Sequence, residues 1–274
     1  MPDLHVNGVR LNYIDEGEGE ETVVFSHGLL WSHHMFRPQI DALKANYRCI
    51  AWDHRGQGSS EVPANKIHTI EETYEDAVAL IEALELGPVH FVGLSMGGFV
   101  GIRLGARRPD LVRSLSLLDT AADPEPAANV PKYRRLSWVV RIFGVIDLLA
   151  GQVAPIMFSK SFLEDPDKAD IREEWIGRLK GNNRKIYRAV HGVIERDAVT
   201  DELVNITAPT MVLRGDEDVA IAEPRARALA NGISGATWVS VPAAGHTSTI
   251  EQPELVTAAL EAFLGDVAKG AAAQ

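Results

Sequence analysis

The stretch Val89-His90-Phe91-Val92-Gly93-Leu94-Ser95-Met96-Gly97-Gly98 decides the fold, because a short apolar run turns abruptly into glycines around a serine. The apolar run predicts a buried strand, and the apolar residues from Phe99 onward recur at helical spacing. Glycines two residues before and after Ser95 leave room for a turn in which larger side chains would clash. The pattern therefore predicts a strained turn that presents the Ser95 hydroxyl at a helix N-terminus, where the helix dipole favours a developing negative charge.

Strand-like runs alternate with helix-like segments along most of the chain. The expected strands are Arg48–Trp52, Val89–Val92, Leu115–Leu118, Thr210–Leu213 and Thr237–Val241. The expected helices between them are Phe36–Ala45, Ile70–Leu86, Gly98–Arg107 and Arg225–Ala230. Continuous apolar strands that alternate with helices predict a mostly parallel, doubly wound α/β sheet covered on both faces. Before them, Asn7-Gly8 is a pair that tolerates the positive φ values of a hairpin turn.

The strand-like runs stop between Asp119 and Thr207. A proline-rich entry there is followed by helix-like segments near 132–150, 152–163, 166–180 and 182–196. The interval is too long for an ordinary loop, so an inserted helical unit is expected. The predicted domains are an α/β core of residues 1–121 and 205–274, and a helical cap of residues 122–204 over one end of the sheet. The last six residues, 269–274, are expected to fray.

Charge and composition exclude several classes of partner. The 274 residues carry a formal net charge of −11 and no run rich in lysine or arginine, so no nucleic-acid partner is expected. No stretch reaches the roughly 18 apolar residues that cross a bilayer, and the first residues do not resemble a signal peptide. A cytoplasmic protein without a membrane partner is predicted. The single cysteine, Cys49, is expected to be an inert buried thiol. The oligomeric state stays open, and a homo-oligomer is compatible with the sequence.

The Ser95 hydroxyl needs a positioned base to become a nucleophile. In a strand–turn–helix motif of this kind the order along the chain is serine, acid, histidine, which leaves His191 and His246 as candidates. His191 lies in an amphipathic segment of the cap, where a surface or packing role is expected. His246 follows the last strand in a loop of small residues, at the sheet edge where such a histidine belongs. His246 is therefore the predicted base.

The acid is expected after the strand Thr210–Leu213, where Asp216 and Asp218 both occur. A Gly-x-x-Asp spacing favours Asp218, whose role would be to fix the histidine tautomer and stabilise the imidazolium. Asp216 would then cap or stiffen the turn. Asp119, at the end of the strand before the cap, is a third candidate.

An oxyanion formed during acyl transfer needs two backbone N–H donors. One is expected from Met96, directly after the serine. The other is expected from Leu29, because Gly28 lets the backbone of this loop approach closely. His27 precedes Ser95 in the chain, so its ring is expected to brace the loop rather than to act as a base.

Five motifs in order make the sequence resemble the α/β-hydrolase superfamily from Val23 to about Leu264. They are His27-Gly28, Asp53-His54-Arg55-Gly56-Gln57-Gly58-Ser59-Ser60, Gly93–Gly98, Gly215–Asp218 and Gly245-His246. The resemblance implies the α/β-hydrolase fold and a scaffolding role for the block from Asp53 to Ser60. The segments Gly93–Gly98 and Asp218-Val219-Ala220 are similar to the 3-oxoadipate enol-lactonase branch, with its arylesterase and acyl-homoserine-lactone hydrolase relatives. Dehalogenases and epoxide hydrolases of this fold carry an aspartate at the position of Ser95.

The expected function is metal-independent hydrolysis of carboxylic esters or lactones, acyl-homoserine lactones among them, through an acyl-enzyme on Ser95. No cofactor is expected, because zinc-protease, P-loop and dinucleotide-binding motifs do not occur. Three alternatives stay open: a carbon–carbon bond hydrolase of the same fold, a perhydrolase, and a small-molecule receptor with slow turnover.

The cap is rich in large apolar residues, which predicts an apolar substrate pocket. The pocket candidates are Trp138, Phe143, Met157 and Phe158. Such a pocket favours an acyl or aryl ester, or an acylated lactone, over a dicarboxylate. Cations for a second carboxylate could come from Arg134, Arg135 and Arg141, but their helical setting indicates a solvated face.

Overall fold

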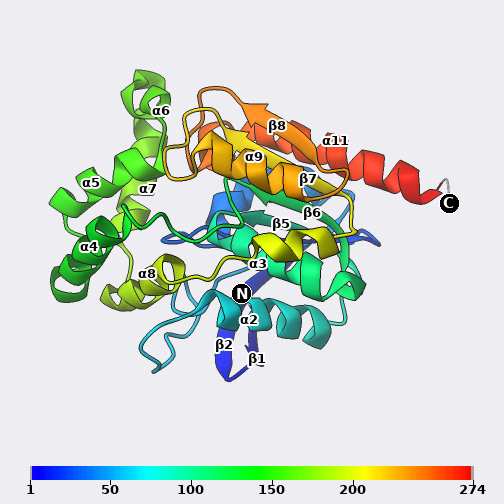
Figure 1. The fold of residues 1–274 in the computed structure, drawn as a ribbon, viewed down its shortest axis with the longest axis horizontal. Coiled ribbons are helices and arrows are strands. Elements are labelled where there is room, and N and C mark those ends of the chain that lie inside the picture. Colours follow the sequence, from blue (N-terminus) through cyan, green and yellow to red (C-terminus); the bar gives the residue numbers. More distant parts are fainter. Residues whose placement is uncertain (1, 273–274) are drawn as a thin grey trace.

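A computed structural model of the chain describes residues 2–272, which form one eight-stranded sheet with flanking helices (Figure 1). The strands are β1 (Asp3–Val6), β2 (Val9–Glu16), β3 (Thr22–Ser26), β4 (Arg48–Trp52), β5 (Val89–Leu94), β6 (Val112–Leu118), β7 (Thr210–Gly215) and β8 (Thr237–Val241). Their order across the sheet is β1-β2-β4-β3-β5-β6-β7-β8. The hairpin predicted at Asn7-Gly8 joins β1 to β2, and the pairs from β4 to β8 are all parallel. The predicted mostly parallel sheet is confirmed.

Helices cover both faces of the sheet. Those of the core are α1 (Arg37–Leu43), α2 (Ile70–Ala83), α3 (Met96–Arg107), α9 (Glu223–Gly232), α10 (Ser248–Glu251) and α11 (Pro253–Ala272). Apolar side chains of α2, α3 and α9 belong to one buried cluster, and those of α1 and α11 belong to a second. Because the central strands β3 and β5 are covered from both sides, every one of their residues is buried, which explains their continuous apolar sequence. The doubly wound arrangement is as predicted.

The parallel strands β5, β7 and β8 end at the same edge of the sheet. The loops that follow them carry Ser95, Asp218 and His246, so residues far apart in sequence meet there. This is the edge at which parallel α/β sheets usually place their ligands.

Five helices lie between β6 and β7, at one end of the molecule (left in Figure 1). They are α4 (Val130–Phe143), α5 (Asp147–Met157), α6 (Lys160–Glu164), α7 (Ala169–Lys180) and α8 (Tyr187–Ile194). Residues 119–209, all of them described, contain no strand. Side chains of α5 and α7 join the same buried cluster as those of β3 and β5. Whether residues 122–204 form an independent unit stays a prediction.

Three sequence-based boundaries differ from the structure. The segment expected near 132–150 is two helices, because Gly144 takes a φ of +79° and ends α4. Helix α3 begins at Met96, directly after Ser95, because the turn itself is a single residue. The C-terminal helix continues to Ala272, whereas fraying was expected from residue 269 onward, so the expectation is wrong for residues 269–272. Residues 273–274 lie outside the described part of the chain.

Two further expectations can be compared with the structure. Burial raises the pKa of the Cys49 thiol to about 12, as expected for an inert cysteine. None of the helices formed by residues 2–272 combines the length and the apolar character needed to cross a membrane.

Candidate active site

Ser95 occupies the turn between β5 and α3 with a φ of 52° and a ψ of −109°. This is a region that residues with a side chain rarely adopt, so the position is strained. A Cβ atom at Gly93 would overlap the carbonyl of Gly97, and one at Gly97 would overlap the carbonyl of Ser26. The glycines on both sides of Ser95 are therefore required by the geometry of the turn.

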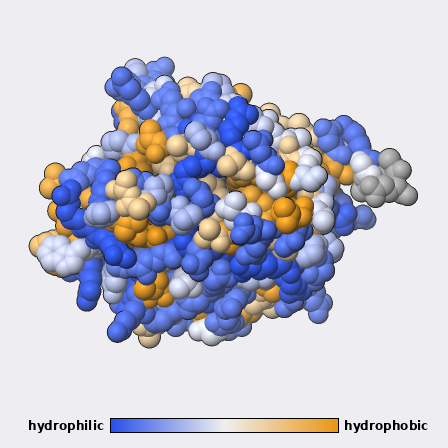
Figure 2. Space-filling view, in the orientation of Figure 1, coloured by the Kyte–Doolittle hydropathy of each residue, from blue (hydrophilic) through white to orange (hydrophobic). Residues whose placement is uncertain are grey.

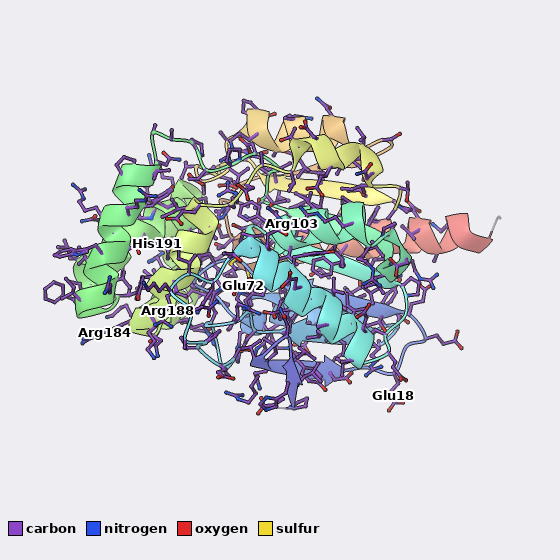
Figure 3. All side chains as sticks on the ribbon, turned by 60° about the horizontal axis from the view of Figure 1, so that its bottom comes forward. Glu18, Glu72, Arg103, Arg184, Arg188 and His191 are labelled. Atoms are coloured by element: carbon purple, nitrogen blue, oxygen red, sulfur yellow. The ribbon has the colours of Figure 1, made fainter. Side chains whose placement is uncertain are left out.

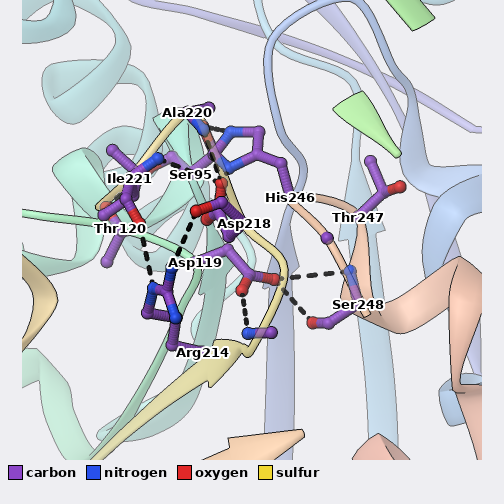
Figure 4. Close-up of polar contacts among 12 residues, drawn as sticks. Ser95, Asp119, Thr120, Arg214, Asp218, Ala220, Ile221, His246, Thr247 and Ser248 are labelled. Carbon is purple, nitrogen blue, oxygen red and sulfur yellow. Dashed lines mark hydrogen bonds and ion pairs between the residues drawn. The ribbon is translucent and has the colours of Figure 1, made fainter. Parts of the chain in front are cut away.

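The His246 ring lies between Ser95 and Asp218 (Figure 4). Its Nε2 atom is 2.7 Å from Ser95 Oγ, and its Nδ1 atom is 3.0 Å from Asp218 Oδ2. All three residues are at least nine-tenths buried. Burial lowers the pKa of His246, but the Asp218 carboxylate raises it, and the result is a pKa above the ordinary value of histidine. A ring in this position can accept the Ser95 proton and be stabilised as an imidazolium.

Asp218 is held in place by its own loop. Its Oδ1 atom accepts hydrogen bonds from the N–H groups of Ala220 at 2.8 Å and Ile221 at 3.0 Å, which leaves Oδ2 for His246. The alternative acid, Asp216, is exposed and accepts a hydrogen bond from Ser240 on β8. The structure therefore brings Asp218, and not Asp216, to His246.

The third candidate, Asp119, is fully buried at the end of β6. Its Oδ1 atom accepts a hydrogen bond from Gly215 N–H at 2.8 Å, and its Oδ2 atom accepts one from Ser248 Oγ at 2.6 Å. Burial and the charge of Asp218 raise the pKa of Asp119 to about 7. Asp119 thus tethers the loops that carry Asp218 and His246 rather than bonding to the imidazole.

Glu251 is a buried residue at this site that no motif or spacing in the sequence indicates. Its Oε2 atom accepts hydrogen bonds from Ser159 N–H at 2.8 Å and Gly245 N–H at 3.0 Å. Its Oε1 atom accepts one from Thr247 Oγ1 at 3.0 Å. The carboxylate therefore binds the residues on both sides of His246 and ties them to the start of α6.

Both predicted oxyanion donors belong to segments that meet at the Ser95 cavity. Met96 is the first residue of α3, and Leu29, in the loop after β3, lines the same cavity as Ser95. His27 braces this loop, since its Nδ1–H donates to the Gly28 carbonyl at 2.7 Å and its Nε2 accepts the backbone N–H of His54 at 2.9 Å.

Gln57, within the block from Asp53 to Ser60, links the two predicted oxyanion segments. Its Oε1 atom accepts a hydrogen bond from Leu30 N–H at 2.9 Å, and its Nε2 atom lies 3.5 Å from the Met96 sulfur. Leu30 has a φ of 75°, a strained conformation that this hydrogen bond helps to hold. The block is therefore a scaffold, as the resemblance implied, and it reaches the site through Gln57.

A cavity of about 1030 Å³, its open mouth included, extends from Ser95 and His246 toward the cap. Most of its wall is aliphatic, with side chains from α4, α5 and α8. Away from the reacting end, the polar residues in the wall are Glu125, Tyr133 and Ser137. No lysine or arginine lines the cavity within residues 2–272.

The polar wall residues differ in their bonding. The Glu125 carboxylate accepts hydrogen bonds from Arg196 at 3.2 Å and from Asn129 at 2.8 Å, so its charge is compensated outside the cavity. Ser137 is 2% exposed, and its hydroxyl has no hydrogen-bond partner among the described residues. Burial raises the pKa of Tyr133, which keeps this phenol neutral.

The structure corrects most of the predicted pocket residues. Met157 lines the cavity, whereas Trp138 and Phe143 are 60% and 57% exposed and lie outside it. Helix α4 faces the cavity with Tyr133, Leu136, Ser137 and Val140, a spacing of three and four residues that leaves Trp138 on the opposite face. Phe158 is buried against the Trp31 ring at 5.8 Å and does not line the cavity.

The other charged and titratable candidates lie elsewhere. Arg134, Arg135 and Arg141 are exposed, as their helical setting indicated. His191 lies on α8 (Figure 3), and its Nδ1 atom is 3.8 Å from Glu195. No group of three or more histidine, cysteine, aspartate or glutamate side chains in the described chain is arranged to hold a metal ion.

The fold and this site are typical of α/β proteins that carry a Ser-His-Asp constellation at the carboxyl edge of their sheet. Comparison with known proteins identifies the family. The model of the alpha/beta hydrolase family matches residues 23–259, so the chain belongs to this family. The 3-oxoadipate enol-lactonase 1 of Acinetobacter baylyi is 28% identical over 241 residues, which cover 88% of this chain and 87% of that protein.

Solved structures agree with this assignment. The enol-lactonase from Burkholderia xenovorans superimposes with a TM-score of 0.89 at 29% identity, covering 96% of this chain and 100% of that chain. A thermophilic esterase from Thermogutta terrifontis, in its malate-bound form, gives a TM-score of 0.87 at 30% identity, with 94% of each chain covered. The predicted α/β-hydrolase fold and the resemblance to the enol-lactonase branch are confirmed.

Proposed function

We propose that this chain is a metal-independent serine hydrolase of carboxylic esters or lactones, with Ser95, His246 and Asp218 as its catalytic triad. The observation that carries the proposal is the buried, hydrogen-bonded series from Asp218 through His246 to Ser95, of which His246 and Ser95 line an apolar cavity. An imidazole nitrogen 2.7 Å from the hydroxyl of a serine is the arrangement that activates this side chain as a nucleophile.

In the first half-reaction, Ser95 Oγ attacks the carbonyl carbon while His246 Nε2 takes the hydroxyl proton. The N–H groups of Met96 and Leu29 stabilise the oxyanion. The carbon–oxygen bond to the leaving group then breaks, and the imidazolium gives its proton to that oxygen. The product is an acyl-enzyme on Ser95 and a free alcohol, or an alcohol still tethered to the acyl chain when the substrate is a lactone.

In the second half-reaction, His246 takes a proton from water, which attacks the acyl-enzyme and releases the carboxylic acid. The proton returns to Ser95 Oγ through His246. Asp218 holds the ring in the tautomer that both steps need and stabilises its charged form.

The cavity supports a neutral acyl group as the substrate. Its wall is mainly aliphatic, and no lysine or arginine among residues 2–272 lines it to pair with an anionic chain end. A second carboxylate on the substrate would lose its hydration without gaining a cation, which is unfavourable. Although related proteins are enol-lactonases, this wall favours acyl or aryl esters and acylated lactones over a dicarboxylate.

A matched pair of substrates tests this account. The p-nitrophenyl ester of hexanoate and the p-nitrophenyl monoester of adipate have the same chain length and differ in the terminal carboxylate. We expect kcat/KM for the neutral ester to be at least tenfold higher, and N-acyl-homoserine lactones to be hydrolysed as well. A chelator should leave these rates unchanged, and loss of activity with EDTA would overturn the metal-free mechanism.

The outcome also separates the alternatives. Faster hydrolysis of the adipate monoester would contradict the assignment of a neutral acyl group. A folded protein that turns over none of the esters or lactones would favour a carbon–carbon bond hydrolase or a slow receptor. Peroxide-dependent formation of a peracid, measured in the same assay, would indicate perhydrolase activity through the same acyl-enzyme.

A further inference from the structure

The outer surface of α4 and α5 exposes large apolar side chains at one end of the molecule. Of the nine large apolar residues that are exposed within the described chain, five lie between residues 138 and 148. They are Trp138, Ile142, Phe143, Ile146 and Leu148, with exposed fractions of 60%, 39%, 57%, 42% and 70%. Figure 2 shows apolar side chains among hydrophilic ones at this end. Single exposed apolar residues are common, but a contiguous group marks an interaction surface.

The same end of the molecule is basic, although the chain as a whole is acidic. Residues 130–148 and 178–188, called the cap tip from here on, contain nine of the 27 lysine and arginine residues and one of the 38 aspartate and glutamate residues. The nine are Lys132, Arg134, Arg135, Arg141, Arg178, Lys180, Arg184, Lys185 and Arg188. The single acidic residue, Asp147, is paired with Lys180, and Arg134 and Arg178 are paired with Glu195 and Glu174, which lie outside these two segments. The rest of the chain therefore carries a large acidic excess, and the basic charge is concentrated here.

The two segments of the cap tip are in contact. Arg184 donates a hydrogen bond to the carbonyl of Ile142 at 3.0 Å, and the guanidinium of Arg141 lies 5.2 Å from the centre of the Tyr187 ring. Figure 3 shows Arg184 and Arg188 beside α4. The cations and the exposed apolar side chains therefore form one surface rather than two distant ones.

We propose that the cap tip binds the surface of a bilayer that contains anionic lipids. Protruding tryptophan, phenylalanine, leucine and isoleucine side chains surrounded by lysine and arginine are what a helix needs to lie in the interface of an anionic membrane. The cations would contact lipid phosphates, and the acidic remainder of the protein would face away from the membrane.

Charge decides between a bilayer and a second copy of the chain as the occupant. A two-fold dimer through the cap tip would bring its cations against the same cations of the partner, and only three of the nine, Arg134, Arg178 and Lys180, form ion pairs with acidic side chains of the described chain. An anionic lipid surface supplies the opposite charge. The expectation of no membrane partner rested on the lack of a membrane-crossing segment, which a protein that lies on the surface does not need.

The cap tip also contributes side chains to the wall of the cavity. Val140, Val145 and Leu149 belong to the same stretch as the exposed residues and line the cavity from inside. Docking through the cap tip would therefore place the cavity wall at the membrane interface, where apolar acyl compounds concentrate. The binding itself does not depend on the proposed hydrolytic function.

Co-sedimentation with vesicles tests the proposal on the full chain. We expect binding to vesicles of phosphatidylcholine with phosphatidylglycerol, weak binding to phosphatidylcholine alone, and loss of binding at high salt. Arg134→Glu with Arg135→Glu should weaken partitioning at least tenfold. Trp138→Ser with Phe143→Ser should weaken it similarly, whereas Val204→Ser with Leu255→Ser, which removes exposed apolar residues elsewhere, should leave it unchanged.

Tryptophan fluorescence provides a second readout. Trp138 is the most exposed tryptophan of the described chain, so its emission should shift to the blue when anionic vesicles are added. Trp138→Phe should abolish that shift while retaining co-sedimentation. Equal binding to neutral and anionic vesicles, or no binding by the folded protein, would overturn the proposal. So would a dimer in lipid-free solution that Trp138→Ser with Phe143→Ser dissociates, because the surface would then be a protein interface.

Discussion

The Oδ2 atom of Asp119 accepts a hydrogen bond from Ser248 Oγ at 2.6 Å, two residues beyond His246 in the chain. Through its other oxygen, Asp119 binds the N–H of Gly215 at the end of β7. The side chain therefore connects the loop that carries Asp218 to the loop that carries His246. Since burial and the nearby Asp218 charge raise its pKa to about 7, this tether is also sensitive to pH.

Asp119→Asn should change how stability depends on pH. A carboxyl whose pKa is raised by folding favours the folded state below its unfolded pKa of about 4, and that contribution is lost as pH rises through about 7. The asparagine amide does not titrate, so the difference in unfolding free energy between variant and wild type should move in favour of the variant from pH 4 to 8. Urea denaturation at a series of pH values measures this, and a constant difference would contradict the raised pKa.

The activity should have an acidic limb set by His246. The ring must be neutral to accept the Ser95 proton, and the Asp218 carboxylate holds its pKa above the ordinary value of about 6.5 despite the opposing effect of burial. We therefore expect kcat/KM for a neutral ester to fall as pH decreases through a value above 6.5. Asp218→Asn should lower kcat by about 10⁴-fold, because the tautomer is no longer fixed. An inflection well below pH 6.5 in the wild type would contradict this assignment.

Gln57→Leu should impair the oxyanion donors, although the Gln57 side chain does not itself line the cavity. The substitution leaves the Leu30 N–H without its acceptor and removes the contact with the Met96 sulfur. We expect kcat to fall by about tenfold or more with little change in KM, since the donors act mainly in the transition state. Gln57→Glu keeps the acceptor oxygen and should retain more activity. Equal losses in both variants, or a change in KM alone, would exclude this positioning role.

Ser137→Ala should stabilise the protein. The Ser137 hydroxyl is buried in α4 without a partner among the described residues, and alanine is the better helix former. The expected gain is about 1 kcal/mol, or roughly 2–4 °C in Tm. Ser159→Ala is a matched control with the opposite sign, because its hydroxyl caps α6 by accepting the Phe162 N–H at 2.9 Å. Calorimetry of both variants checks the pair, and a lower Tm for Ser137→Ala would show that its hydroxyl is bonded.

The parts of the site that follow from the sequence are those encoded in short local motifs. The turn at Ser95 needs glycine on both sides, and its strand and helix are strongly patterned, so its position could be predicted. Asp218 and His246 each follow a recognisable strand, and the common edge of a parallel sheet brings such residues together. Local motifs and their order along the chain were therefore sufficient to predict the three residues of the candidate triad.

Long-range contacts and helix orientation could not be predicted in the same way. Glu251 acts on residues near His246 and at the start of α6, and no sequence spacing links those segments. Trp138 and Phe143 are large and apolar, which suggested a pocket, but the face of α4 that meets the cavity is set by tertiary packing.

Trapping the acyl-enzyme tests the central claim most directly. Wild-type protein is mixed with a slowly deacylating p-nitrophenyl ester, quenched in acid and analysed by peptide mass spectrometry. We expect a mass increase of one acyl group on the peptide that contains Ser95, together with a burst of p-nitrophenol. Ser95→Ala should lose both signals, with turnover reduced on the order of 10⁶-fold. Undiminished turnover in Ser95→Ala, or an acyl group found on another residue, would contradict the account.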